Sequence, residues 1–261
     1  MKTRNFIFIT LIFLAAVFSA CEYDNYDGPS CYLTGTVTYD GKPYVFDGNT
    51  SVLKVCQKGF GKDDGGVGIR INEDGKFSQL LFAGKYYMTL SNHQYPFQFA
   101  DFNPLGAGLG YDTLEIDLDS NKEMNLEVIP YYIIDSVTYL PIEETLTTLN
   151  VTVYFHRNDD PRLPEVLPKV QRAFLFAGIN PHVNSATTLT KASRPLNVTD
   201  KGDVTMRLEL SKYRSSTYYV NNYRDFMYIR VGLVLDAEFV ASGYYLFSDL
   251  YKIENVPYLT E

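Results

Sequence analysis

The residues best suited to catalysis or metal binding are few and widely spaced in this sequence. Its three histidines are His93, His156 and His182. None of them belongs to a His-Glu-x-x-His pair or a similar zinc-binding spacing. The sequence also has no Gly-x-Ser-x-Gly nucleophile elbow and no phosphate-binding Gly-Lys-Ser/Thr loop. We therefore expect neither an enzyme nor a cofactor.

Adjacent carboxylates occur at residues 63–64, 143–144 and 159–160. Glycoside hydrolysis needs two carboxylates that face one substrate. Neighbouring residues on a strand point to opposite faces, and a loop fixes neither of them, so these pairs are interpreted as solvated loop acids. Calcium is the metal that such loops best suit, because it selects oxygen ligands on irregular backbone. Its candidate ligands are Asp63, Asp64, Asp159 and Asp160, and no other metal site is predicted.

Cys21 is the residue whose position most clearly indicates covalent chemistry. It directly follows two small residues at the end of an apolar run over residues 6–18, and two basic residues precede that run. A membrane span needs about 20 apolar residues. A basic start, a short apolar core and small residues before a cut site instead indicate a secretory signal peptide over residues 1–20.

This start resembles the signal of bacterial lipoproteins. By that resemblance, Cys21 would become the lipidated first residue, residues 21–30 would form the lipidated cysteine and a linker, and the lipid would hold the protein at a membrane. The acidic residues after Cys21 are also similar to the signal that exports Bacteroidetes lipoproteins to the outer face of the outer membrane. The resemblance thus implies a lipid-anchored outer-membrane protein at the cell surface. A soluble secreted protein is the alternative.

Two further cysteines, Cys31 and Cys56, lie on predicted strands of the first domain. In an oxidising cell envelope such a pair could close a disulfide. Free buried thiols are also common, so both states remain open.

Composition and charge exclude one class of partner and favour one kind of structure. The chain carries a formal charge of −8, which becomes −10 when Lys2 and Arg4 leave with the signal peptide. An acidic protein of this kind is repelled by nucleic acid and by anionic lipid surfaces, so we expect no nucleic-acid partner. Its 22 Tyr and 17 Phe, with no Trp, favour half-buried β-strands.

The pattern from residue 31 predicts a first β-domain over residues 31–129. Apolar residues alternate with threonine over residues 31–39, as in a half-buried strand. Further strands are predicted up to residue 129, with turns at glycine and asparagine. Residues 91–110 are predicted to be a long loop, of the kind that serves in binding.

A second β-domain is predicted over residues 130–261, because Pro130 cannot donate to a sheet ladder and so marks the end of one strand system. About seven strands separated by turn signals favour another sandwich. The predicted strands are residues 132–140, 146–156, 170–177, 187–190, 204–210, 226–235 and 244–247. The expected fold is therefore all-β, with two β-sandwich domains in tandem after the signal peptide and linker.

Three short motifs give the first domain a resemblance to a known module. They are Gly35-Thr36-Val37, Asp74-Gly75-Lys76-Phe77, and residues 82–88 with the sequence Phe-Ala-Gly-Lys-Tyr-Tyr-Met. Their order and spacing resemble the transthyretin-like, carboxypeptidase-regulatory-like β-sandwich, in which Asp-Gly supplies the positive φ of a tight hairpin. The resemblance implies a scaffold or spacer without a catalytic centre.

The whole mature chain resembles a larger family. The lipoprotein start, the linker at residues 24–29, the regulatory-like sandwich and the Val-Ile-Pro-Tyr junction at residues 128–131 are similar to the Bacteroidetes two-domain outer-membrane lipoproteins of unknown function, domain of unknown function 3823. Members are similar in setting to the accessory lipoproteins of polysaccharide-uptake transporters. The resemblance implies capture of a polysaccharide or oligosaccharide beside an outer-membrane transporter complex, and it implies no active-site residues.

Sugar binding would need an exposed aromatic face and polar side chains beside it. The candidate glycan-binding residues are Tyr95, Phe97, Tyr218, Tyr219 and Tyr223, and the alternative is that these rings belong to the core or to strand edges. Thr113 and Ser136 stand in Asp-Thr-Leu and Asp-Ser-Val, which resemble the acceptor of Bacteroidetes O-glycosylation.

These observations lead to a non-catalytic cell-surface lipoprotein that binds glycan or serves as a scaffold in polysaccharide uptake. The alternative is a fimbrial subunit or anchor protein of the two-domain transthyretin-like type. Such a protein would assemble by donating a terminal strand to a neighbour's sheet, and residues 248–261 could supply that strand.

Overall fold

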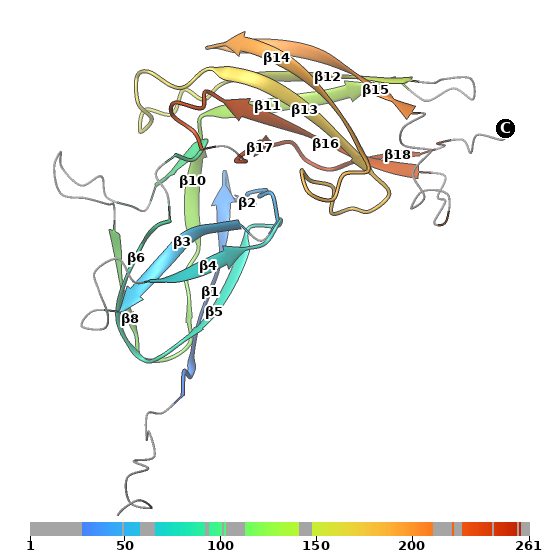
Figure 1. The fold of residues 1–261 in the computed structure, drawn as a ribbon. Helices are drawn as coiled ribbons and strands as arrows, with labels where there is room; N and C mark the ends of the chain where they lie inside the picture. Colours follow the sequence, from blue (N-terminus) through green and yellow to red (C-terminus); the bar gives the residue numbers. More distant parts are fainter. Residues whose placement is uncertain are drawn as a thin grey trace, which may run out of the picture.

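The computed structural model describes residues 28–48, 50–57, 66–91, 94–100, 102, 113–140, 148–210, 221, 226–241, 243–254 and 256. Eighteen strands dominate this part of the chain, which confirms the all-β fold class (Figure 1). Among these residues, no helix is long and apolar enough to cross a membrane.

The first domain contains ten strands in one curled sheet, with the order β7-β10-β1-β5-β4-β3-β6-β8 and with β2 and β9 both paired to β1. β1 is the centre of this arrangement, because it pairs with β2 and β5 antiparallel and with β9 and β10 parallel. The strands are β1 Cys31–Tyr39, β2 Lys42–Pro43, β3 Thr50–Gln57, β4 Val67–Ile71, β5 Lys76–Leu81, β6 Gly84–Leu90, β7 Phe97–Phe99, β8 Thr113–Leu118, β9 Lys122–Glu123 and β10 Leu126–Pro130.

The alternation in the sequence explains how β1 is oriented. Leu33 and Val37 are fully buried on its inner face, as period-two patterning requires. At the β4–β5 hairpin, Gly75 has a φ of 76°, and a Cβ at this position would lie 2.6 Å from the carbonyl oxygen of Val37. Glycine is therefore needed at the turn, which confirms the role predicted for the Asp-Gly pair.

The second domain packs a three-stranded sheet, β11-β12-β15, against a five-stranded sheet, β14-β13-β16-β17 with β18 paired to β16 (Figure 1). Its core is formed by alternating inward residues of both sheets, as in other sandwiches. The strands are β11 Tyr132–Tyr139, β12 Thr148–Arg157, β13 Val170–Gly178, β14 Thr190–Val198, β15 Lys201–Glu209, β16 Phe226–Leu235, β17 Leu246–Phe247 and β18 Tyr251–Glu254.

β7, β14 and β18 differ from the sequence-based expectation. β7 lies inside the segment predicted to be a long loop and pairs with β10. The strand predicted at residues 187–190 begins only at Thr190, since residues 181–187 form a loop against the first domain. β18 was not predicted, and it occupies a place in the chain's own sheet.

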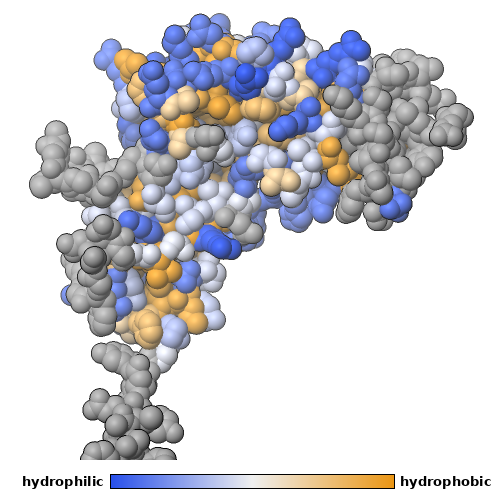
Figure 2. All heavy atoms as spheres, in the orientation of Figure 1, coloured by the Kyte–Doolittle hydropathy of each residue, from blue (hydrophilic) through white to orange (hydrophobic). Residues whose placement is uncertain are grey.

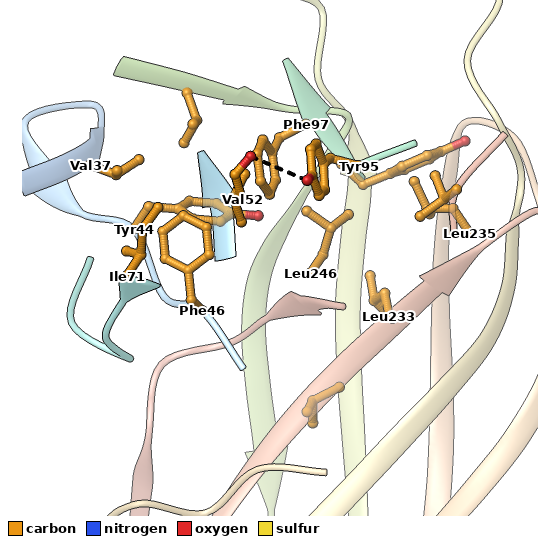
Figure 3. Close-up of a cluster of buried hydrophobic side chains, with 14 of the residues drawn as sticks. Val37, Tyr44, Phe46, Val52, Ile71, Tyr95, Phe97, Leu233, Leu235 and Leu246 are labelled. Carbon is orange, nitrogen blue, oxygen red and sulfur yellow. Dashed lines mark hydrogen bonds between the residues drawn. The ribbon is translucent and has the colours of Figure 1, made fainter. Parts of the chain in front are cut away.

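One hydrophobic cluster runs through both domains. Figure 3 shows Tyr95 and Phe97 of the first domain near Leu233, Leu235 and Leu246 of the second. The ring of Tyr95 stacks on Phe97 at 5.4 Å, and the Tyr95 hydroxyl donates a hydrogen bond to the carbonyl of Val52 (3.2 Å). The two domains therefore share a core at their junction.

The disulfide considered for Cys31 and Cys56 is not formed, because both thiols are free and buried. Strands β5 and β4 lie between β1 and β3 in the sheet, so the two cysteines sit on strands that are not neighbours. Cys31 faces the main core, whereas the Cys56 sulfur lies beside the backbone of Gly66.

Candidate functional site

The aromatic residues predicted to bind glycan from the long loop are core residues instead. Tyr95 is 2% exposed and Phe97 is 5% exposed, so neither ring can face a ligand. The prediction failed because the segment forms β7 and packs against the second domain. Tyr95 also contacts Tyr244 edge to face at 4.7 Å, which adds to that packing.

Several predicted site residues lie outside the described residues, namely Cys21, Asp63, Asp64, Tyr218, Tyr219 and Tyr223. Of the O-glycosylation candidates, Thr113 begins β8 and Ser136 lies on β11, and both are half-buried. These predictions remain open.

The calcium candidate Asp160 has a different partner. Arg162 donates to its carboxylate from Nε (2.9 Å) and Nη2 (2.7 Å). The same Nη2 also reaches Glu127 of β10 (3.2 Å), so Asp160 orients a contact between the domains. Among the described residues, no group of three or more His, Cys, Asp or Glu side chains could hold a metal ion.

The strongest site candidate is a hollow of about 840 Å³ where the two domains meet, which we call the junction pocket. This volume lies in the usual range for small-molecule sites, roughly 300–1,000 Å³. In Figure 2 the second domain overhangs the first at this level. The pocket is lined by Pro43, Val45, Gly48, Asn72, Glu73, Asp74, Pro181, His182, Asn184, Thr187, Arg230, Asp249 and Leu250.

Glu73 is the central acceptor of the junction pocket. The tight turn that Gly75 permits between β4 and β5 holds it toward the second domain. The side-chain amide of Asn184 donates to Glu73 Oε1 at 2.7 Å, and His182 Nδ1 lies 3.0 Å from Oε2. Both partners come from the loop between β13 and β14, so this carboxylate joins the domains at the pocket wall.

The same loop is fixed at a second point by Asp47. The backbone N–H and the hydroxyl of Ser185 donate to its two carboxylate oxygens, at 3.1 and 2.5 Å. Within the loop, the side-chain oxygen Oδ1 of Asn184 accepts hydrogen bonds from the backbone N–H groups of Ala186 and Thr187. Asparagine commonly closes turns in this way, and here it stiffens the segment that carries His182.

Arg230 provides a buried positive charge at the pocket. It lies in the middle of β16, its side chain is only 7% exposed, and its guanidinium is 5.7 Å from the ring of Phe247. Glu73 is 4.0 Å from Nη1, which is too far for a hydrogen bond. In the described part of the chain, Nε and Nη1 have no hydrogen-bond partner.

Burial lowers the pKa of Arg230, against the opposing effects of Glu73, Asp47 and Asp249. The side chain nevertheless stays charged at neutral pH, because arginine titrates far above that range. A buried cation with unused donors is costly for folding, so its presence at a cavity wall marks a functional candidate.

The junction pocket offers hydrogen-bond donors and acceptors side by side. Arg230, Asn72 and Asn184 can donate, while Glu73, Asp74 and Asp249 can accept. Val45, Pro181 and Leu250 supply apolar surface, and the described lining residues include no Phe, Tyr or Trp. This mixture suits a polar, uncharged ligand rich in hydroxyl groups, since a hydroxyl both donates and accepts.

Sequence reasoning missed this site for a physical reason. Glu73 belongs to a turn and His182 to a loop, and only the packing of the two domains brings them together. One signal was nevertheless present. Arg230 interrupts an otherwise apolar strand, and an isolated charge at such a position needs a partner or a function.

Comparison with solved structures defines the fold class. A DUF3823 family protein from Parabacteroides merdae is 21% identical, with a TM-score of 0.61 over 87% of this chain and 100% of that one. A DUF3823 family protein from Bacteroides ovatus is 19% identical, with a TM-score of 0.56 over 87% and 99%. A protein from Bacteroides uniformis, for which carbohydrate binding has been suggested, is 17% identical, with a TM-score of 0.60 over 87% and 100%.

The chain thus has the two-domain β-fold of these proteins. Residues 31–129 match the model of the N-terminal domain of a protein family of unknown function, DUF3823. This match covers the first domain of the chain and agrees with the resemblance in its sequence. A search of curated proteins finds no match.

Proposed function

We propose that this protein is a non-catalytic, lipid-anchored lipoprotein of the outer membrane that binds a glycan at the cell surface, and that the junction pocket is its binding site. The observation that carries the proposal is the buried guanidinium of Arg230, whose Nε and Nη1 have no hydrogen-bond partner in the described structure. A ligand that accepts a hydrogen bond from a buried donor gains more binding free energy than one that accepts from a solvent-exposed donor. The reason is that a buried donor without the ligand stays unsatisfied, whereas an exposed donor binds water.

The pocket chemistry supports a neutral saccharide. The carboxylates of Glu73, Asp74 and Asp249 line the pocket together with Arg230, so an anionic ligand would meet net repulsion. Hydroxyl groups can accept from the guanidinium and donate to the carboxylates at the same time. The carbohydrate binding suggested for the related Bacteroides uniformis protein supports the same ligand class.

In this proposal Cys21 carries the lipid and the protein serves a polysaccharide-uptake system beside an outer-membrane transporter. Growth of cells with labelled palmitate tests the anchor: the protein takes up label, and Cys21→Ser does not. If the wild-type protein took up no labelled palmitate, the lipid anchor would be contradicted. Glycan binding at the junction pocket would be unaffected by that result.

Glycan binding is tested with residues 22–261, by affinity electrophoresis through gels that contain a panel of polysaccharides. We expect retardation by at least one glycan, and loss of that retardation in Arg230→Met. The fold of this variant should survive, because replacing a poorly paired buried charge with an apolar side chain of similar size is often neutral or stabilising.

The matched control is Arg172→Met on the neighbouring strand β13, whose guanidinium lies on the surface. It should bind like the wild type. Absence of retardation with every glycan would overturn glycan binding itself. Retardation that Arg230→Met retains would instead show that the glycan binds elsewhere on the molecule.

A further inference from the structure

The end of the first domain nearest the N-terminal chain carries exposed apolar side chains. They are Tyr32 (47% exposed), Val67 (49%), Leu80 (37%) and Phe82 (45%), and we call this group the apolar tip. Tyr32 pairs with Leu80 across β1 and β5. Val67, Leu80 and Phe82 line one shallow hollow of about 730 Å³. Figure 2 shows hydrophobic surface at this end of the molecule.

A contiguous apolar patch on a protein this acidic indicates a contact surface. Solubility would favour charged side chains at these positions, as on the outer face of most half-exposed strands. Scattered single residues need no explanation, but a cross-strand pair and a shared hollow do not fit that description.

The linker to the anchor leaves the domain at this patch. The backbone N–H of Ser30 donates to the carbonyl of Leu81 (3.0 Å), and Pro29 lines the hollow of the apolar tip. Pro29 is the eighth residue after Cys21. A fully extended chain covers at most about 3.6 Å per residue, so the lipidated residue lies within roughly 30 Å of the tip. The tip is therefore the described surface that the anchor holds nearest to the membrane.

We propose that the apolar tip rests on the lipid surface and seats the first domain against the membrane. This inference depends on the lipid anchor of the proposed function. Anchoring makes the contact intramolecular, so a patch too small to bind free vesicles can still be occupied. Lys85 pairs with Asp117 across β6 and β8, and Lys122 donates to the backbone carbonyl of Asp117, so basic side chains accompany the acidic ones at this end.

The test uses residues 21–261 linked through Cys21 to a maleimide lipid in phosphatidylcholine vesicles, which replaces the natural acyl chain. Cys31 and Cys56 are buried and should not react. The protein has no tryptophan, so Phe82→Trp places a single tryptophan at the tip, whose emission is excited selectively over that of tyrosine. With lipids brominated in their acyl chains, Phe82→Trp should lose most of its emission.

The matched control is Tyr154→Trp on β12, since Tyr154 is 43% exposed, close to the value for Phe82, and lies in the second domain. Its emission should not change with brominated lipid. Leu80→Trp gives a second reporter in case Phe82→Trp fails to fold. If brominated lipid quenches the tip reporters no more than it quenches the control reporter, the proposal is overturned. The apolar tip would then be a contact surface for a protein partner. Because the tether is synthetic, this result is independent of whether cells acylate Cys21.

Discussion

At the scale of single residues, charged groups at the domain junction have two different roles. Glu73 and Asp47 accept hydrogen bonds that hold the β13–β14 loop, whereas Nε and Nη1 of Arg230 have no hydrogen-bond partner among the described residues. A carboxylate that accepts hydrogen bonds across the domain junction has a structural role, and that role is enough to explain its presence. A buried guanidinium whose Nε and Nη1 have no hydrogen-bond partner among the described residues is not explained in this way, and that asymmetry selects Arg230 as the residue to test for binding.

Asp160 should make stability depend on acid pH. The hydrogen bonds from Arg162 hold the pKa of Asp160 at about 2, below its ordinary value in an unfolded chain. A depressed pKa stabilises the folded state above the unfolded value near pH 4, and this contribution is lost as the pH falls through about 2. We expect Asp160→Asn to lower the urea midpoint at pH 7 and to match the wild type near pH 2.

The neighbouring Asp159 provides the control for that measurement. It is exposed on the same loop, and Asp159→Asn should leave the midpoint unchanged at both pH values. A constant difference between Asp160→Asn and the wild type from pH 7 to pH 2 would contradict the ionic origin of the effect.

At the scale of elements, the sequence predicted those strands whose patterns are decided locally. The alternation in β1 and the apolar run of β16 are visible in the residues themselves, and both strands occur where they were expected. β7 and β18 are short and owe their strand conformation to pairing with β10 and β16, so local pattern could not reveal them. For the same reason the junction pocket, built from a turn, a loop and a strand, could not be predicted.

The pairing of β18 bears on assembly by strand donation. Ile253 is 2% exposed in the core, and its strand already completes the sheet beside β16. We expect Ile253→Ala to lower the free energy of unfolding by about 2–5 kcal/mol, the usual cost of removing a buried isoleucine side chain. Urea unfolding measures this change, and the exposed Glu254→Ala serves as the control.

The same two variants test the fimbrial alternative. The wild-type chain should remain monomeric in size-exclusion chromatography, because its terminal strand is used internally. Polymers of the wild type that Ile253→Ala prevents would instead support a donated strand.

At the scale of the whole molecule, the shared core should couple the two domains. Tyr95 contributes to both, through Phe97 and Val52 on one side and Tyr244 on the other. We expect the wild type to unfold in a single cooperative transition. Tyr95→Ala should reduce stability by about 3–5 kcal/mol, as for other buried aromatic residues, and should separate the transition into two.

Tyr95→Phe is the matched control, because it keeps the ring and removes only the hydroxyl. Loss of that hydrogen bond costs about 1 kcal/mol and should leave one transition. Calorimetry distinguishes the outcomes, and two transitions in the wild type would show that the domains are energetically independent.

The length of β1 has a consequence for where a ligand would be captured. This strand of nine residues starts at the apolar tip and ends beside the residues that line the junction pocket. At about 3.3 Å per residue it spans roughly 30 Å. A molecule seated on its tip would thus hold the pocket at a fixed height clear of the lipid headgroups. A longer linker would let the seated domain move over a wider area around its lipid anchor. The distance between the junction pocket and the headgroups would stay the same.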